Sequence, residues 1–132
     1  MKILFICKYN RFRSRIAEAI FNKLNKNKKY KVKSAGIIRG NPLDKNQLNI
    51  AKKLELNIKG NPKGLASSLL KWQDITVIVA DNVPPEIINN KKHGKKLIVW
   101  KIPDAKTNSR KEIEEIINKI KNKVIKFLGE LK

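Results

Sequence analysis

Residues 1–24 read MKILFICKYNRFRSRIAEAIFNKL, and they divide into an apolar run, a polar loop and an amphipathic segment. The apolar run, Ile3–Ile6, has no polar alternation, which is typical of a parallel strand covered on both faces. From Arg13 onward, isoleucine and leucine recur every four residues among good helix formers, as on one face of a helix. The stretch therefore predicts a buried strand, a loop that begins at Cys7, and a helix.

The rest of the chain repeats this alternation. Asp44 and Ser109 each precede a glutamine or a glutamate by three residues, as in a capping box that opens a helix. The alternation predicts an α/β fold: a three-layer sandwich in which a four-stranded, largely parallel sheet is flanked by helices. Further strands are expected at Tyr30–Ser34, where Ala35-Gly36 ends the strand, at Ile75–Ala80 and at Leu97–Trp100. Further helices are expected from Asp44 to Leu54, over Leu65–Trp72, after Pro84-Pro85, and from Ser109 to Leu131.

Length and charge limit the possible classes of protein. The 132 residues are enough for one hydrophobic core, so we expect a single domain over residues 1–132. With 31 Lys and Arg against 11 Asp and Glu, the formal net charge is +20, which favours anionic partners such as phosphate groups or nucleic acid. No apolar run approaches the roughly 20 residues of a membrane-spanning helix, and the N-terminal run is shorter than the roughly 7–15 apolar residues of a signal peptide. The lone cysteine, Cys7, fits a reducing compartment, so we expect a cytoplasmic protein without a membrane partner.

The loop after the first strand has the residues of an anion site. It reads CKYNRFRS over residues 7–14: a cysteine, five residues, an arginine and a serine, directly before the helix. Such a loop can turn several backbone N–H groups towards one centre, and these donors and the helix dipole would hold an anion and favour an ionised thiolate on Cys7. Arg13 could grip two oxygens of a phosphate-like group, Ser14 could donate to the sulfur, and Asn10 tolerates the left-handed backbone of a tight loop. The alternative is an inert buried cysteine beside a solvated arginine.

In this loop and beyond it, the sequence resembles the low-molecular-weight protein tyrosine phosphatases and the arsenate reductases that share their fold. The resemblance runs in order over nearly the whole chain, and the loop is its most specific part. It implies a four-stranded parallel sheet flanked by helices. The matching residues after the first strand are Cys7, Asn10, Arg13, Ser14, Ala17 and Glu18, then Ser34-Ala35-Gly36, Pro42, Asp44, Asp81, Trp100, Pro103 and Asp104.

The resemblance also implies a mechanism. Cys7 would attack phosphorus and form a phosphocysteine intermediate, while Arg13 holds the oxygens of the transition state. Asp104 would protonate the leaving oxygen and then activate water, and its place after the fourth strand puts it on the same edge of a parallel sheet as Cys7; a turn or cap role is the alternative for this residue. Ser14 would stabilise the sulfur, and Asp81 would play a structural role at the end of its strand. The residues expected to bind substrate, largely through backbone N–H groups, are Lys8, Tyr9, Asn10, Arg11, Phe12, Arg13 and Ser14.

Departures from the family pattern bear on the substrate. Tyr9 stands where the family usually has glycine, and Arg39 stands where an aromatic pocket wall is often found. Ala105-Lys106 replaces the proline and tyrosines that typically follow the acid, and the stretch Trp100–Asp104 is closer to the arsenate reductases. However, Cys7 has no second cysteine to relay oxidation, so a reductase would need an external thiol. We therefore rank a phosphomonoester phosphatase of the protein tyrosine type first, acting on a phosphorylated protein or a small aryl phosphate, and an arsenate reductase with an external thiol donor second.

Phosphate or arsenate is the expected ligand, and neither a cofactor nor a metal is expected. His93 is the only histidine and cannot build a metal site alone, and no dinucleotide-binding or Walker-type motif is present. A basic nucleic-acid-binding module is the alternative of another class, because lysines cluster at residues 23–33 and 91–96. Lysine is, however, spread over every segment and aromatic residues make up only 6% of the chain, so this alternative ranks last.

Overall fold

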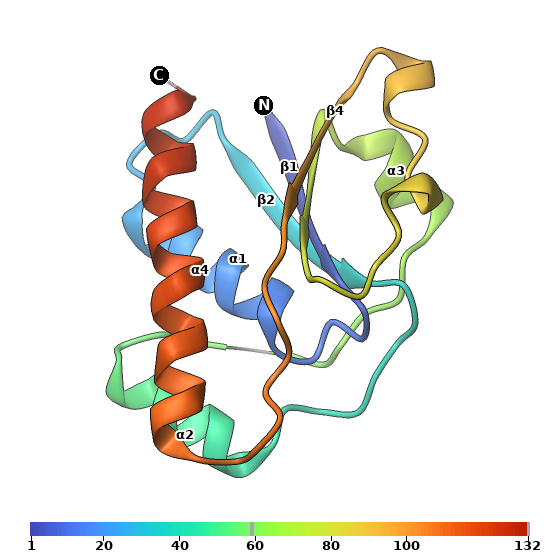
Figure 1. Cartoon of the computed structure of the whole chain (residues 1–132). Coiled ribbons are helices and arrows are strands. Elements are labelled where there is room, and N and C mark those ends of the chain that lie inside the picture. The colour runs from blue at the N-terminus through green and yellow to red at the C-terminus, as the bar shows by residue number, and fades with distance from the viewer. Residues whose placement is uncertain (59, 132) are drawn as a thin grey trace.

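Four parallel strands form the centre of the computed structural model, which describes residues 1–58 and 60–131 (Figure 1). Within that part of the chain, no helix combines the length and the apolar character needed to cross a membrane. The predicted α/β sandwich with a four-stranded parallel sheet is confirmed, with the strand order β2-β1-β3-β4. The strands are β1 (Lys2–Cys7), β2 (Lys31–Gly36), β3 (Ile75–Val79) and β4 (Lys96–Trp100). The helices are α1 (Arg13–Leu24), α2 (Lys45–Lys53), α3 (Ser67–Trp72) and α4 (Arg110–Glu130), with 3₁₀ turns at Pro85–Ile87 and Lys91–His93.

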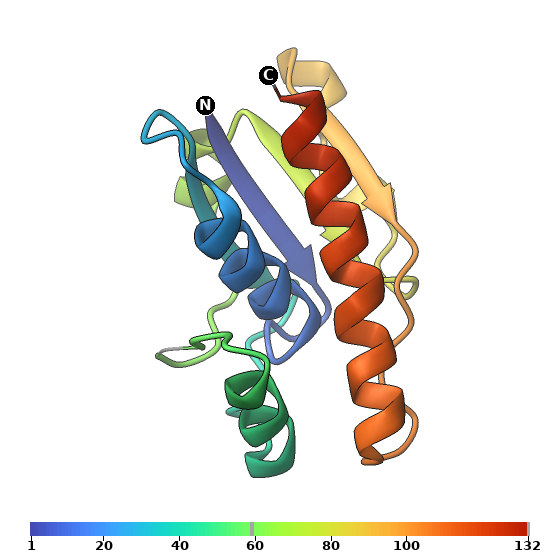
Figure 2. The ribbon, with the colours of Figure 1, turned by 90° about the vertical axis from the view of Figure 1, so that its left-hand side faces the viewer.

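The run of apolar residues in β1 reflects the helices on both faces of the sheet. Ile3 and Phe5 pack against α1 and α4, whereas Leu4 and Ile6 pack on the side of α3 (Figure 2). Successive side chains of a strand point to opposite faces, so a strand covered on both faces needs apolar residues at every position. The α1–α4 side holds a cluster of aromatic rings whose neighbouring centroids lie 5.8 Å to 6.4 Å apart. Its members are Phe5, Phe21, Trp100 and Phe127.

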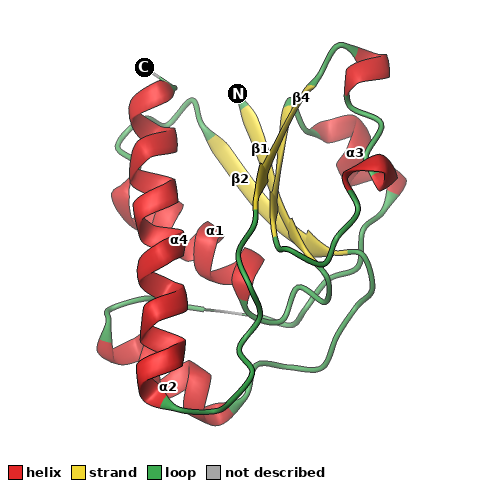
Figure 3. Cartoon of the chain, viewed as in Figure 1, coloured by secondary structure: helices red, strands yellow, loops and turns green. Residues whose placement is uncertain are grey.

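The position of β1 inside the sheet decides where a ligand can bind. From β1 the chain passes through α1 to β2 on one side, whereas β3 and β4 lie on the other side of β1. Ligands of open parallel sheets bind at such a switch point, beyond the carboxyl ends of the strands. All four strands are parallel, so the loops that follow them meet at this edge (Figure 3).

The second strand is longer than predicted, because Ala35 and Gly36 belong to β2 instead of ending it. Gly36 pairs with Cys7 at the end of the sheet, beside the loop that follows β1. A Cβ atom at Gly36 would lie 2.5 Å from the backbone nitrogen of Asn10, closer than such atoms approach one another. The glycine therefore marks a close approach of two backbone segments within a strand.

Both predicted helix caps are present, but neither capping box closes. The carboxylate of Asp44 accepts hydrogen bonds from the N–H groups of Asn46 (2.8 Å) and Gln47 (3.3 Å). The Ser109 hydroxyl accepts one from the N–H of Glu112 (3.2 Å). In return, the Oε1 atom of Gln47 has no hydrogen-bond partner among the described residues. The carboxylate of Glu112 bonds to the loop that precedes α4.

Candidate active site

The loop after β1 turns its carbonyl groups outward. The consecutive carbonyl oxygens of Cys7–Tyr9 accept hydrogen bonds of 3.0–3.1 Å from N–H groups in residues 37–40. A trans peptide is planar, so its C=O and N–H point in opposite directions, and no peptide bond in the structure is cis within the described residues. The N–H groups that follow these carbonyls therefore face the inside of the loop. No backbone N–H of residues 8–14 donates to another described residue, so these donors are available to a ligand.

Asn10 holds the shape of this loop. Its φ angle of 52° is in the left-handed region, which confirms the backbone conformation predicted for it. The buried side-chain amide donates to the hydroxyls of Ser14 (2.8 Å) and Ser34 (3.0 Å). Its carbonyl oxygen accepts from the N–H of Lys63 (2.8 Å), and Ser34 donates onward to Glu18 (2.8 Å). The loop is thus tied to α1, to β2 and to the segment before α3.

The sulfur of Cys7 lies 3.0 Å from the hydroxyl oxygen of Ser14. A hydroxyl has one proton and two lone pairs, and the Ser14 oxygen already accepts a hydrogen bond from Asn10. Its proton can therefore be donated to the sulfur, and its second lone pair can accept from a thiol. Ser14 also lies in the first turn of α1, where the helix dipole favours negative charge. A hydroxyl group and the start of α1 thus lie beside the sulfur.

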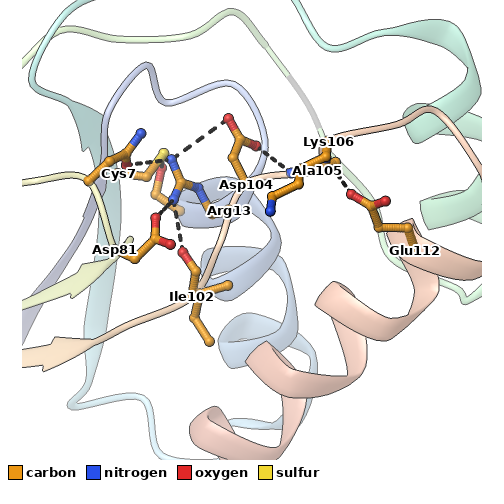
Figure 4. A network of polar contacts seen from close by, with 10 residues as sticks. Cys7, Arg13, Asp81, Ile102, Asp104, Ala105, Lys106 and Glu112 are labelled. Atoms are coloured by element: carbon orange, nitrogen blue, oxygen red, sulfur yellow. Dashed lines mark hydrogen bonds and ion pairs between the residues drawn. The ribbon is translucent and has the colours of Figure 1, made fainter.

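The guanidinium group of Arg13 is buried, and residues that follow β3 and β4 hold it in place. It donates to the carbonyl oxygen of Ile102 (2.9 Å) and to the side-chain oxygen of Asn82 (2.9 Å). The carboxylates of Asp81 and Asp104 lie 3.6 Å and 3.9 Å from its nitrogens (Figure 4). A guanidinium has five N–H donors in a rigid plane. Its orientation is therefore fixed while donors remain for an anion beside Cys7.

Cys7, Arg13 and Asp104, which the sequence predicts to act together, line one pocket of about 160 Å³. A water molecule takes about 30 Å³ of liquid volume, so a tetrahedral oxyanion fits there. The Asp104 side chain is 50% exposed at the pocket mouth, whereas that of Arg13 is only 2% exposed. The carboxylate is therefore accessible both to solvent and to a ligand in the pocket. Tyr9 and Gln47 also contribute to the walls.

Of the other predicted binding residues, Arg11 and Phe12 also line this pocket, whereas Lys8 does not. The Lys8 ammonium lies 5.2 Å from the ring centroid of Tyr9, Arg11 donates to the carbonyl of Pro42 (3.2 Å), and Phe12 is buried in the core. The backbone N–H groups of all three residues donate to no other described residue. Their roles in binding stay predictions.

Tyr9 stands at a position where the related family usually has glycine, and the structure shows how it fits. A Cβ atom at Gly40 would lie 2.6 Å from the Cβ atom of Tyr9. The absence of a side chain at residue 40 thus leaves room for the tyrosine, whose ring is partly exposed and lines the pocket.

Sequence reasoning missed the residues that support Arg13. Asp81 was expected only to end its strand, yet its carboxylate is an ion-pair partner of the guanidinium, and Asn82 was not singled out. The signal for both was their place directly after the third strand, on the edge that also carries Cys7. Gln47 was expected only as a cap partner, and no sequence signal places its side chain in the pocket.

Inorganic phosphate or arsenate is expected to protect Cys7 from alkylation. Cys7 is the only cysteine of the chain, so the rate of labelling by iodoacetamide reports on this thiol alone. An anion held by the loop N–H groups and Arg13 covers the sulfur, and labelling should slow in proportion to the fraction of sites occupied. Mass spectrometry of timed samples measures the rate, with chloride at equal ionic strength as the control. An unchanged rate at millimolar phosphate would contradict the anion site.

Comparisons with known proteins identify a family and a set of structures with a similar fold. A family model described as low molecular weight phosphotyrosine protein phosphatase matches residues 2–132. An arsenate reductase from Archaeoglobus fulgidus matches with 23% identity and a TM-score of 0.78, over 96% of this chain and 98% of that chain. The tyrosine phosphatase Wzb from Escherichia coli, in complex with sulphate, matches with 23% identity and a TM-score of 0.83, over 99% and 98% of the two chains. The YwlE arginine phosphatase from Geobacillus stearothermophilus matches with 17% identity and a TM-score of 0.81, over 98% and 92%. No curated protein sequence matches the chain significantly.

Proposed function

Because the chain belongs to the low molecular weight phosphotyrosine protein phosphatase family, we propose that it hydrolyses phosphate monoesters through a phosphocysteine intermediate on Cys7. One observation carries the proposal: the sulfur lines a pocket with Arg13, beside a loop whose N–H groups have no partner among the described residues. Charge on the transferring phosphoryl group is stabilised by fixed donors of this kind. A cysteine with a purely structural role would not require such N–H and guanidinium donors beside its sulfur.

In the first step, the Cys7 thiolate attacks phosphorus and an S–P bond forms. The bond between phosphorus and the leaving oxygen breaks, and that oxygen takes a proton from Asp104. The N–H groups of residues 8–14 and the guanidinium of Arg13 hold the equatorial oxygens. The half-exposed position of Asp104 at the pocket mouth supports this role, because the leaving group must point out of the pocket.

In the second step, water attacks phosphorus and the S–P bond breaks. Asp104, now ionised, takes a proton from this water, and inorganic phosphate leaves. The sulfur departs as a thiolate, which the hydroxyl of Ser14 stabilises by donating to it. The 3.0 Å separation of the two atoms supports this role.

A phosphorylated protein or a small aryl phosphate is the proposed substrate. The partly exposed ring of Tyr9 in the pocket wall can stack against an aryl leaving group. The description of the family and the tyrosine phosphatase among the similar structures support an aryl ester. The lone thiol requires reducing conditions, so we place the protein in the cytoplasm.

Arsenate reduction is the second candidate, and the similarity to an arsenate reductase favours it. Arsenate has the shape and charge of phosphate, so Cys7 could bond to arsenic with loss of water. An external thiol would then attack the sulfur, release arsenite and leave a mixed disulfide on Cys7. A second external thiol would reduce this disulfide, so two thiols supply the two electrons.

Replacing Asp104 with asparagine is expected to lower kcat/KM for phenyl phosphate by about 10²-fold, because the phenolate then leaves without a proton. The loss for p-nitrophenyl phosphate should be smaller, since its leaving group is a weaker base. Steady-state kinetics on both esters, beside thiol-dependent arsenate reduction, tests the proposal on the same preparation. Asp74→Asn is the matched control, because Asp74 lies at the opposite end of the sheet and an amide oxygen can still accept from the N–H of Lys2. Wild-type protein that reduces arsenate but leaves both esters intact would reverse the order of the two candidates.

A further inference from the structure

The loop that carries Asp104, residues 101–109, has no helix or strand of its own. On the side of β4 it is fixed at Ile102, whose carbonyl oxygen accepts from Arg13 (2.9 Å) and from the N–H of Asp81 (3.0 Å). Among the described residues, the carboxylate of Asp104 itself accepts only from the adjacent N–H of Ala105 (3.0 Å), apart from its 3.9 Å ion pair with Arg13. The direction of this carboxylate therefore depends on how the loop is held on its other side.

Glu112, in the first turn of α4, holds that other side. Its Oε1 atom accepts hydrogen bonds from the N–H groups of Lys106 and Thr107, the latter at 3.3 Å. Its Oε2 atom accepts from the hydroxyl of Thr107 (2.8 Å). Figure 4 shows the resulting path from Glu112 through residues 106 and 105 to Asp104 beside Arg13. The carboxylate of Glu112 thus binds Lys106 and Thr107, which follow the proposed acid, Asp104, by two and three residues.

The negative charge of Glu112 strengthens these hydrogen bonds. Hydrogen bonds from the backbone of Lys106 and from Thr107 hold the pKa of Glu112 below its ordinary value. The group is therefore ionised at neutral pH, and its hydrogen bonds are charge-assisted. It also lies at the positive end of the α4 dipole.

A purely structural role for Glu112 would be to close the capping box on Ser109. The carboxylate instead bonds to residues 106 and 107. The end of the loop has a separate attachment, because the side-chain amide of Asn46 in α2 donates to the carbonyl of Asn108 (2.8 Å). The contacts of Glu112 therefore act on the part of the loop nearest to Asp104.

We propose that Glu112 is a positioning residue that sets the place of the Asp104 carboxylate above Cys7 through the backbone of Lys106 and Thr107. The inference rests on the proposed function. Misplacement of a catalytic group by about 1 Å can cost up to about 10²-fold in rate. Loss of Glu112 should therefore impair proton transfer to the leaving group, while the anion site around Arg13 stays intact.

The test compares two esters that differ in their need for an acid. In Glu112→Ala, kcat/KM for phenyl phosphate should fall about tenfold and that for p-nitrophenyl phosphate less than about twofold. Glu112→Gln, which keeps the size of the side chain and one acceptor, should lie between wild type and Glu112→Ala, and it replaces the alanine variant if that one does not fold. Glu115→Ala is the matched control, because Glu115 is an exposed glutamate in the same helix; it should match wild type on both esters.

Two further measurements separate positioning from general damage. In an Asp104→Asn background, Glu112→Ala should cost no further activity, because its effect passes through the acid. Hydrogen exchange at the N–H groups of Lys106 and Thr107 should accelerate in Glu112→Ala, with exchange in the sheet unchanged. Equal losses on both esters that persist without Asp104 would overturn the inference and leave phosphatase activity standing. A wild-type protein that hydrolyses neither ester would remove the proposed function and this inference with it.

Discussion

Replacing Cys7 with serine is expected to abolish turnover of p-nitrophenyl phosphate and of arsenate, with a loss of roughly 10⁴-fold or more. A serine hydroxyl stays protonated at neutral pH and is a far weaker nucleophile than a thiolate, so its attack on phosphorus or arsenic is expected to be very slow. The fold should be unchanged, because serine fits the space of Cys7 and its hydroxyl can keep the hydrogen bond to Ser14. Steady-state kinetics and a thermal melt of both proteins measure the two halves of this prediction.

Anion binding provides the control for this variant. The donors that would hold phosphate come from the backbone of residues 8–14 and from Arg13, so Cys7→Ser should still bind inorganic phosphate with an affinity close to that of wild type. Isothermal titration measures it. If Cys7→Ser kept most of the wild-type turnover, another group would be the nucleophile, and the assignment of Cys7 would be wrong.

The sequence was sufficient for the first unit of the fold and for the centre of the site. Its signals are local: an unbroken apolar run, a loop of fixed length, and a helix that begins at Arg13. The resemblance to the phosphatase family singled out Asp104, and the topology of a parallel sheet agrees with it by placing the ends of all strands on one edge. The structure brings the carboxylate to 3.9 Å from Arg13. Local pattern, the family resemblance and topology together thus predicted which residues meet, and their catalytic roles stay predictions.

The sequence could not predict which of several possible hydrogen-bond partners a side chain would take. Glu112 has the spacing of a capping-box residue, but its carboxylate bonds to Lys106 and Thr107, which reach it only because of the path taken by the loop. Gly36 is a residue typical of a strand end, yet it belongs to β2, where it pairs with Cys7 and lies close to the backbone of Asn10. Such outcomes depend on contacts between segments that are remote in sequence, and no local pattern encodes them.

Replacing Arg13 with lysine is expected to lower kcat/KM for aryl phosphates by about 10³-fold, although the positive charge is kept. Removal of a single fixed donor at a developing negative charge costs about 10²–10³-fold, and an ammonium cannot reproduce the planar fork that grips two oxygens. The structure adds a second cost. The carbonyl of Ile102 and the side-chain oxygen of Asn82 both accept from the guanidinium, and a single ammonium cannot reach the positions of both donors.

The same variant should therefore also lose stability, by about 1–3 kcal/mol for a buried acceptor left without its donor. Denaturant unfolding measures this loss, and steady-state kinetics at temperatures well below the melting point keeps it separate from the loss of activity. Arg110→Lys is the matched control, because Arg110 is exposed and its ion pair with Glu114 can be kept by lysine; it should match wild type in both measurements. If Arg13→Lys retained activity within tenfold of wild type, charge alone would suffice at this position. The orientation that Ile102 and Asn82 impose on the guanidinium would then have no part in the transition state, and the geometric reading of the site would be wrong.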